Sequence, residues 1–456
     1  MIPAIGKLRT HIANRNLWSL AIAMTAQVVQ SAAGLALLPF MVTRLSAAEV
    51  GIWYIFMAVQ GLATIADFGF QPTLARAFAV GFAGGEGLQK QGLSLSTGTG
   101  TPNLTLVAEV LSAARRLYMW LALGMFVLLA LAGTPYISWL ALKGGLPMLD
   151  TQIAWLLFAV AIAVNLYLLW ISPMLIGAGK VELNYLYLVL GRGGFAAAGI
   201  VILISGGGLI ALSCAMIASL LLGRFAARFF IAPIVASLRD VVTQPSGLAT
   251  TLKSVSPNAV RMGCVLIGGF LITRYSLFAI STFQGLVVSG AYAISLQLFT
   301  ALSAVSQMPM QISTKQLVGA RIADDRLRMR RILIRNIAAL VAIFTTGSLT
   351  ILFALPFALH AIGSNVSLIP SPSLELLAVV MLLETQLSGA AFFITTGNDV
   401  PFLKSALWSG LAVAVLTTLV SWLGWGLIAV IASQGLVQLA YNSWRWPIRA
   451  WQETRS

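Results

Sequence analysis

The sequence predicts an all-α integral membrane protein with about twelve transmembrane helices, each needing about 20 apolar residues. Of the 456 residues, 59% are hydrophobic and only 9% are charged, and the mean hydropathy is +0.92. A soluble globular chain carries about 25% charged residues. Apolar stretches of spanning length recur along the whole chain, and no polar stretch between them is long enough for a soluble domain.

The individual spans follow from the apolar stretches in chain order. The first one, after MIPAIGKLRTHIANRN, is longer than the apolar core of a typical signal peptide, so we expect an uncleaved span. Spans longer than the hydrocarbon thickness fit by tilting. The predicted spans are 17–43, 49–70, 112–142, 151–177, 183–205, 207–235, 255–281, 286–312, 332–361, 373–397, 401–423 and 425–447.

The basic residues predict the orientation, because cytoplasmic segments collect Lys and Arg. With the N-terminus inside, only Arg44 and Lys143 fall outside, and Arg192 and Arg274 fall within spans. The other basic residues among the 28 lie on the inside, so both termini are expected in the cytoplasm. The net charge of +15 then reflects topology and anionic lipid headgroups, and no nucleic-acid partner is expected.

The connections between spans favour a transporter over an enzyme. The outside connections are short, such as SGGGL near Ser205, whereas an enzyme acting on lipid-linked sugars needs a polar loop with carboxylates. The polar stretch 84–103 reads as a flexible loop, and ARIADDRLRMRRILIR reads as a cytoplasmic amphipathic linker. Cys214 and Cys264 lie in apolar runs and offer no metal-binding spacing.

The two halves of the chain show a weak internal repeat. GIWYIFMAVQGLATIADFGFQPTLAR, from Gly51, aligns without gaps with GAYAISLQLFTALSAVSQMPMQISTK, from Gly290. An aromatic residue follows in each, at Trp53 and Tyr292, and a base ends each. Pairing the second span with the eighth fits a six-plus-six transporter plan. The predicted domains are 1–235 and 255–456, joined by a cytoplasmic linker at 236–254.

The N-terminal pattern LLPFMVTRLSAAEVGIWYIFMAVQGLATIADFGFQPTLAR resembles the start of Wzx-type O-antigen flippases, a family of polysaccharide transporters. Members show a Pro near the end of the first span, a Gly-x-[Trp/Tyr] opening the second, and an Asp-Phe-Gly followed by a base. LIGAGKVELNYLYLVLGRGG looks like the family's Gly-x-Gly-Lys loop, and SGAYAISLQLFTALSAVSQMPMQI looks like its eighth span. The matching N-terminal residues are Pro39, Gly51, Trp53, Asp67, Phe68, Gly69 and Arg76.

The resemblance covers nearly the whole chain and implies both a fold and a substrate. The fold is that of the multidrug/oligosaccharidyl-lipid/polysaccharide (MOP) exporter superfamily, with two six-helix bundles around a central cavity. The substrate is an undecaprenyl-diphosphate-linked oligosaccharide, moved from the inner to the outer leaflet of the bacterial cytoplasmic membrane. Membrane lipids and polysaccharide assembly proteins are the other expected partners, and no cofactor or metal is expected.

Moving a diphosphate through hydrocarbon requires a cationic, water-filled cavity, and Arg suits this task because its planar fork donates paired hydrogen bonds. Arg192, flanked by glycines in LVLGRGGFAAAG, is the leading candidate, and Arg274 lies in the outer half of the seventh span. Arg261 and Arg76, near inner ends of spans, complete the candidate set. The alternative for each is an arginine that anchors at lipid headgroups.

Two acids are candidates for coupling transport to a proton or sodium gradient. Glu384, in VVMLLETQLSG, falls near the middle of the tenth span, where an ionisable residue is a functional candidate by default. Asp67, in ADFGFQPTLAR, is placed to hold Arg76 or another base at the inner mouth. For Glu384 the alternative is a structural ion pair or a protonated, hydrogen-bonded acid. For Asp67 the alternative is the end of the helix at the membrane surface, where a charge is allowed without any function.

Uncharged polar residues mark candidate cavity faces. Gln27 and Gln30 are three apart in the first span and so share a helix face. Gln297, Gln307 and Gln311 recur in the eighth. Hydrogen bonding between helices is an equally good explanation for each of these residues.

Other functions remain as alternatives. A multidrug antiporter of the same fold binds cations and so favours acids in its cavity, whereas the deep charges here are two arginines and one glutamate. A lipid II flippase is expected to carry two further C-terminal spans. A polysaccharide polymerase needs a large outside loop.

Overall fold

The computed structural model of the chain describes residues 33–85, 101–238, 263–397 and 401–455. These residues form helices and no strand, so the predicted all-α class is confirmed. Nine of the described helices are long and apolar enough to cross a membrane, and a tenth span results when one bent helix pair is counted as one. Each predicted span from the second onward overlaps one or more described helices, whereas the first span is described only from residue 33 and the seventh only from residue 263.

The described residues divide into two compact units. Unit 1 holds 33–37 and the described parts of 63–136 and 149–263, and unit 2 holds 38–62, 137–148 and the described parts of 264–456. The predicted linker at 236–254 lies largely outside the described residues, so the predicted domain boundaries stay a prediction.

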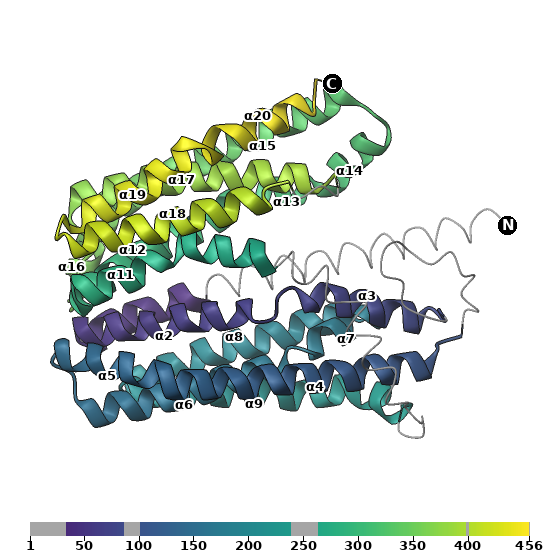
Figure 1. Ribbon diagram of the computed structural model, residues 1–456, viewed down its shortest axis with the longest axis horizontal. Helices are drawn as coiled ribbons and strands as arrows, with labels where there is room; N and C mark the ends of the chain where they lie inside the picture. The colour runs from purple at the N-terminus through teal and green to yellow at the C-terminus, as the bar shows by residue number, and fades with distance from the viewer. Residues whose placement is uncertain (1–32, 86–100, 239–262, 398–400, 456) are drawn as a thin grey trace. The chain divides into compact units, whose positions relative to one another are not determined.

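In unit 1, α8 and α9 pack against each other, and a short turn joins them (Figure 1). The π-helical turn η1 continues α4 into α5, and residues 137–143 of α5 belong to unit 2. The helices are α3 (Phe70–Phe82), α4 (Leu104–Leu128), η1 (Leu129–Gly133), α5 (Thr134–Lys143), α6 (Met148–Leu168), α7 (Ile171–Gly177), α8 (Val181–Ile204) and α9 (Leu209–Ala236).

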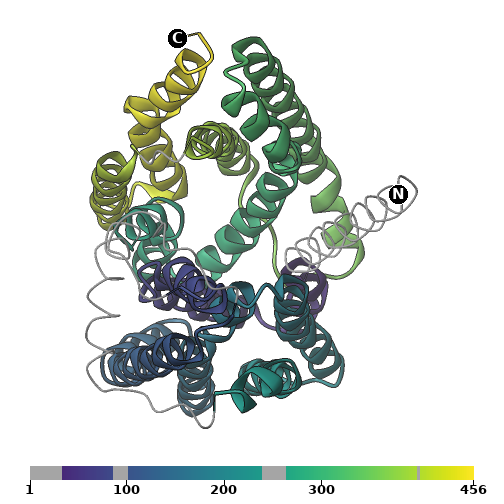
Figure 2. The same ribbon diagram turned by 90° about the vertical axis from the view of Figure 1, so that its right-hand side faces the viewer.

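Unit 2 contains most of α2 and the C-terminal helices, and α17, α19 and α20 contact one another. Figure 2 shows the C-terminal end of the chain, in yellow, running obliquely to the line of sight. The helix Gly263–Thr273 precedes α11 at a bend of 41°. The helices are α2 (Ala47–Ile65), α11 (Tyr275–Phe283), α12 (Leu286–Ser306), α13 (Met308–Ile312), α14 (Thr314–Ile322), α15 (Arg326–Leu349), η2 (Thr350–Ala354), α16 (Leu355–Ala361), α17 (Ser371–Thr395), α18 (Leu403–Trp422), α19 (Gly426–Ala440) and α20 (Asn442–Gln452).

Large apolar side chains cover the outer surface of these helices. On α18, Trp408, Val415 and Trp422 are 71%, 57% and 68% exposed. Exposed apolar area of this extent is unfavourable in water and favourable against lipid chains. The surface therefore agrees with the membrane location that the composition predicts.

The break between α2 and α3 lies in the ADFGF stretch. Phe68 and Gly69 have φ angles of 47° and 76°, in the left-handed region that interrupts a right-handed helix. The turn places the Phe68 ring against Gly263, where a Cβ atom would overlap it. Gly69 meets the backbone demand at little steric cost, whereas Phe68 adopts a conformation that is uncommon for a residue with a side chain.

The two glycines that open the repeated segments meet in the fold. A Cβ atom on Gly290 would lie 3.0 Å from the Gly51 nitrogen and 3.1 Å from the Ala47 carbonyl oxygen. A Cβ atom on Gly51 would overlap the Leu286 carbonyl. Small residues let α2 and α12 approach to backbone contact, as in other membrane helix pairs.

We expect Gly51→Leu to separate α2 from α12, because the added side chain has no space beside Leu286. Overpacking of this kind costs about 1–3 kcal/mol, which thermal unfolding of the detergent-purified protein measures. The matched control is Gly124→Leu on α4, where a Cβ atom would meet nothing within 4 Å. Equal melting temperatures for the two variants would contradict the close contact.

Candidate functional site

Arg274 lies at the break between the helix Gly263–Thr273 and α11. Its side chain is half-buried, near the phenol groups of Tyr54 on α2 and Tyr292 on α12. The Tyr292 hydroxyl is 2.8 Å from the Ser276 Oγ atom, so it has a hydrogen-bond partner of its own. Within the described residues, no ion pair joins the Arg274 guanidinium to a carboxylate. Unit 2 thus holds a cation at a helix break without a counter-charge.

Arg192 lies on α8 in unit 1, and its side chain is exposed. Gly194 packs against α9, with its Cβ position 3.5 Å from Leu222, whereas the Cβ position of Gly191 is open. No carboxylate of the described residues pairs with Arg192. Both arginines that the sequence places within spans therefore lack a carboxylate partner in the part of the chain that the structure describes.

Glu384 lies on α17, and its closest polar neighbours are Gln434 and Gln438 on α19. Four side-chain atoms of this group are inaccessible to solvent and lack a hydrogen-bond partner within the described structure. They are Glu384 Oε1, Gln434 Oε1, Gln434 Nε2 and Gln438 Nε2. The acid therefore faces amides, with no arginine paired to it among the described residues. A carboxylate removed from water is stable only when a proton, a cation or hydrogen bonds compensate it.

A hydrogen-bond network continues from this cluster along α19 and α20. The Asn442 Nδ2 atom donates to the Gln438 Oε1 atom at 2.7 Å and to the Ser409 Oγ atom at 2.8 Å. The Trp446 Nε1 atom donates to the Asn442 Oδ1 atom at 3.0 Å. This network fixes Gln438 and leaves its Nε2 atom for a further partner.

The sequence prediction did not single out Gln434 and Gln438. The signal was present, because two glutamines four apart in ASQGLVQLA share one face of a helix. Their contact with Glu384, on a different helix, depends on tertiary packing.

Asp67 contacts a tyrosine and a glutamine, and no base. The Tyr118 hydroxyl on α4 donates to the Asp67 Oδ1 atom at 2.5 Å. The Gln71 backbone N–H donates to the Oδ2 atom at 3.4 Å, and its side-chain amide at 3.5 Å. Arg76 is exposed and pairs with no acid in the described part of the chain. The side chain of Asp67 thus holds the α2–α3 break against α4, and it does not hold Arg76.

The remaining candidates divide between described and undescribed parts of the chain. Gln27, Gln30 and Arg261 lie outside the described residues. Gln297 is half-buried on α12. The Gln307 Nε2 atom donates to the Ser303 Oγ atom at 3.1 Å, and the Thr385 Oγ1 atom donates to the same Ser303 oxygen at 2.8 Å. This chain of contacts joins α12 to α17 next to Glu384.

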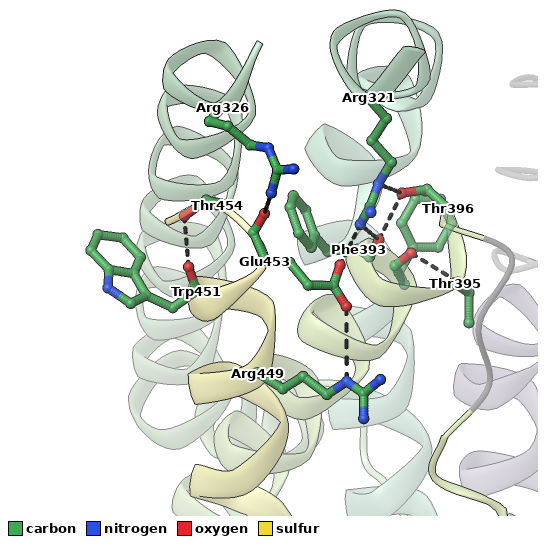
Figure 3. A network of polar contacts seen from close by, with 10 residues as sticks. Arg321, Arg326, Phe393, Thr395, Thr396, Arg449, Trp451, Glu453 and Thr454 are labelled. Carbon is green, nitrogen blue, oxygen red and sulfur yellow. Dashed lines mark hydrogen bonds and ion pairs between the residues drawn. The ribbon is translucent and has the colours of Figure 1, made fainter. Parts of the chain in front are cut away.

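The predicted amphipathic linker forms a polar cluster with the end of the chain (Figure 3). The Arg321 Nη2 atom lies 2.7 Å from the Glu453 Oε2 atom and 2.9 Å from the Phe393 carbonyl oxygen. The Arg321 Nε atom donates to the Thr396 Oγ1 atom at 3.1 Å. The Arg449 Nε atom lies 3.9 Å from the Glu453 Oε1 atom. These contacts tie α14, α17 and α20 together, which is a structural role.

No family model and no curated protein matches the sequence. The fold matches that of an inward-facing multidrug resistance MATE family transporter of the MOP superfamily, with a TM-score of 0.61. The two sequences are 14% identical, and the match covers 94% of this chain and 96% of the transporter. An outward-facing MATE transporter structure matches with 15% identity, 96% coverage of both chains and a TM-score of 0.57.

A third similar structure is a MOP superfamily transporter from Pyrococcus furiosus Vc1, described as having reversed polarity of its binding pocket and a different function. It is 13% identical, covers 96% of both chains and has a TM-score of 0.50. At these identities the likeness establishes the fold, which is that of MATE transporters of the MOP superfamily, with two bundles of about twelve helices. The expected fold, about twelve helices in two bundles, is confirmed.

Proposed function

We propose that the protein is a flippase that moves an undecaprenyl-diphosphate-linked oligosaccharide, an O-antigen or exopolysaccharide repeat unit, from the inner to the outer leaflet. The observation that carries this proposal is the pair of arginines within spans, Arg192 and Arg274, that have no carboxylate partner among the described residues. A guanidinium at membrane depth is costly unless an anion accompanies it. A diphosphate supplies that anion and matches the fork of the side chain.

Two further observations support this substrate class. The Pro39, Gly51, Trp53 and Asp67-Phe68-Gly69 pattern resembles Wzx-type flippases. The fold is one that solved transporters use. In this proposal the protein works by alternating access in the bacterial cytoplasmic membrane, with both termini in the cytoplasm.

Glu384 with Gln434 and Gln438 is the proposed coupling site. The Glu384 Oε1 and Gln434 Oε1 atoms are buried acceptors without a partner in the described structure, which a proton on the acid or a sodium ion would satisfy. The driving gradient would act on unit 2, where Arg274 also lies.

The test of this function is a deletion strain in which lipid-linked oligosaccharides are located by leaflet. We expect the complete undecaprenyl-linked unit to accumulate on the inner leaflet, because flipping precedes polymerisation outside. Restoration by the intact gene on a plasmid is the control. Complete, unpolymerised units on the outer leaflet would reject a flippase and indicate a polymerase.

A multidrug exporter is the second candidate, favoured by the half-buried acid Glu384 within a span and by the multidrug resistance transporters that share the fold. It predicts that the deletion strain loses resistance to cationic drugs while its lipid-linked oligosaccharides keep their normal distribution.

A further inference from the structure

Unit 1 holds a second group of cations that have no carboxylate partner among the described residues, and it is built from residues other than Arg192. The Arg115 guanidinium on α4 lies 4.5 Å from the centre of the Trp170 ring, and the Arg224 guanidinium on α9 lies 5.3 Å from it. Trp170, between α6 and α7, is fully buried. Helices far apart in sequence thus bring two positive charges to one indole.

Cation–π contact alone does not balance these charges. Arg115 and Arg224 lie close enough to repel each other, and Tyr167 and Tyr187 are their neutral neighbours. Among the described residues, neither guanidinium has an ion pair or a hydrogen bond to a carboxylate. The Trp170 Nε1 atom is buried and has no acceptor in the described structure. The group therefore consists of donors without an acceptor, which is the composition of an anion site.

The depth of the group matches the level of lipid phosphates. A helix rises ~1.5 Å per residue, so Arg115 lies about 16 Å from the start of α4. On the same scale, Trp170 lies about 15 Å from Lys180, and Arg224 lies about 18 Å from the end of α9. These three ends lie on the same side, because the helices alternate in direction. The continuous helix Leu104–Lys143 has 40 residues, or about 60 Å. Set evenly across about 30 Å of hydrocarbon, it reaches the boundary about 15 Å from each end.

We propose that Arg115, Arg224 and Trp170 form a binding site in unit 1 for a lipid-borne phosphate group. Two lipids carry this chemistry, a membrane phospholipid and an isoprenyl diphosphate. The second source rests on the proposed function, whereas the first does not. Arg115 and Arg224 supply charge-assisted hydrogen bonds to phosphate oxygens, and the indole holds both guanidiniums in place by stacking.

The experiment uses full-length protein purified in detergent, with native mass spectrometry and thermal unfolding as readouts. The probes are phosphatidylglycerol and farnesyl diphosphate, each added alone and then in competition. We expect Arg115→Gln and Arg224→Gln each to weaken the binding of at least one probe about 10-fold or more, as lost charge-assisted hydrogen bonds do. The matched controls are Arg116→Gln and Arg228→Gln, which remove exposed charges on the same two helices.

The competition identifies the source of the phosphate. Displacement of phosphatidylglycerol by farnesyl diphosphate assigns the site to the transported lipid, and persistence of bound phosphatidylglycerol assigns it to a resident phospholipid. If Arg115→Gln and Arg224→Gln bind both probes as tightly as the wild type does, the proposal is overturned. Export is not measured, so failure of this site and failure of the flippase function remain distinguishable.

Thermal unfolding separates binding from packing. A ligand that binds the folded state raises its melting temperature. A site for lipid phosphate predicts that the probe-induced rise disappears in Arg115→Gln and Arg224→Gln. If the arginines only stack on Trp170, the variants will melt at a lower temperature but keep the full probe-induced rise, and the proposal fails. If Arg224→Gln does not fold, Arg224→Lys replaces it in the experiment. Because lysine retains the charge, this variant should keep part of the probe-induced rise in melting temperature.

Discussion

Arg274→Gln is expected to reduce export of the lipid-linked oligosaccharide by about 10- to 100-fold, which corresponds to about 1.5–3 kcal/mol for a hydrogen bond to a charged group. The reason is that the guanidinium has no carboxylate partner among the described residues. It lies at the helix break before α11, near tyrosines of α2 and α12. Glutamine keeps polar atoms there but cannot neutralise a diphosphate. The rate at which the lipid-linked unit becomes accessible on the outer leaflet measures the effect.

The stability of the same variant distinguishes a substrate-binding residue from a structural one. Removing a half-buried, unpaired charge should leave the melting temperature unchanged or raise it, because the cost of desolvating the guanidinium disappears. Arg274→Lys should retain part of the activity, since it keeps the charge without the fork. The control is Arg44→Gln, which removes an exposed charge next to a span. Wild-type export by Arg274→Gln at normal protein levels would exclude the cationic role.

Much of the fold was predictable from the sequence because a bilayer imposes one requirement on every span. Backbone groups in hydrocarbon must be satisfied internally, so a long apolar stretch becomes a helix regardless of its neighbours. The predicted span 286–312 has the bounds of α12 and α13 taken together. The break at Phe68 and Gly69 was less predictable, because its left-handed backbone and its packing against Gly263 involve a distant segment.

The candidate site was predictable only in part, because hydropathy identifies charges within spans but not the residues they meet. Arg192, Arg274 and Glu384 stood out as ionisable residues in apolar surroundings. That Asp67 accepts a hydrogen bond from Tyr118, with Arg76 left exposed, follows from how α3 and α4 pack. A nearby base in the sequence was the natural partner to expect, and the helix turn at Gly69 directs the chain elsewhere.

The half-buried acid Glu384 is the second residue whose replacement should have a large effect. Glu384→Gln is expected to reduce gradient-driven export by about 10-fold or more, since a functional acid within a span is rarely replaceable by an amide. Glutamine has nearly the same shape and can bond with Gln434 and Gln438, so the fold should persist. It cannot release a proton or neutralise a sodium ion, which removes the proposed coupling. Export into vesicles under an imposed proton or sodium gradient measures the loss and identifies the ion.

Glu375→Gln is the matched control, because it removes an exposed acid from the first part of the same helix, α17. Coupling also predicts a specific pattern in the impaired variant. Glu384→Gln should still exchange substrate down its own concentration gradient, because the binding arginine is intact, while an imposed ion gradient no longer accelerates export. If the variant responds to the gradient as the wild type does, Glu384 serves only to join α17 to α19. If exchange is lost together with coupling, the acid acts in substrate movement itself, and the assignment of coupling to this cluster is wrong.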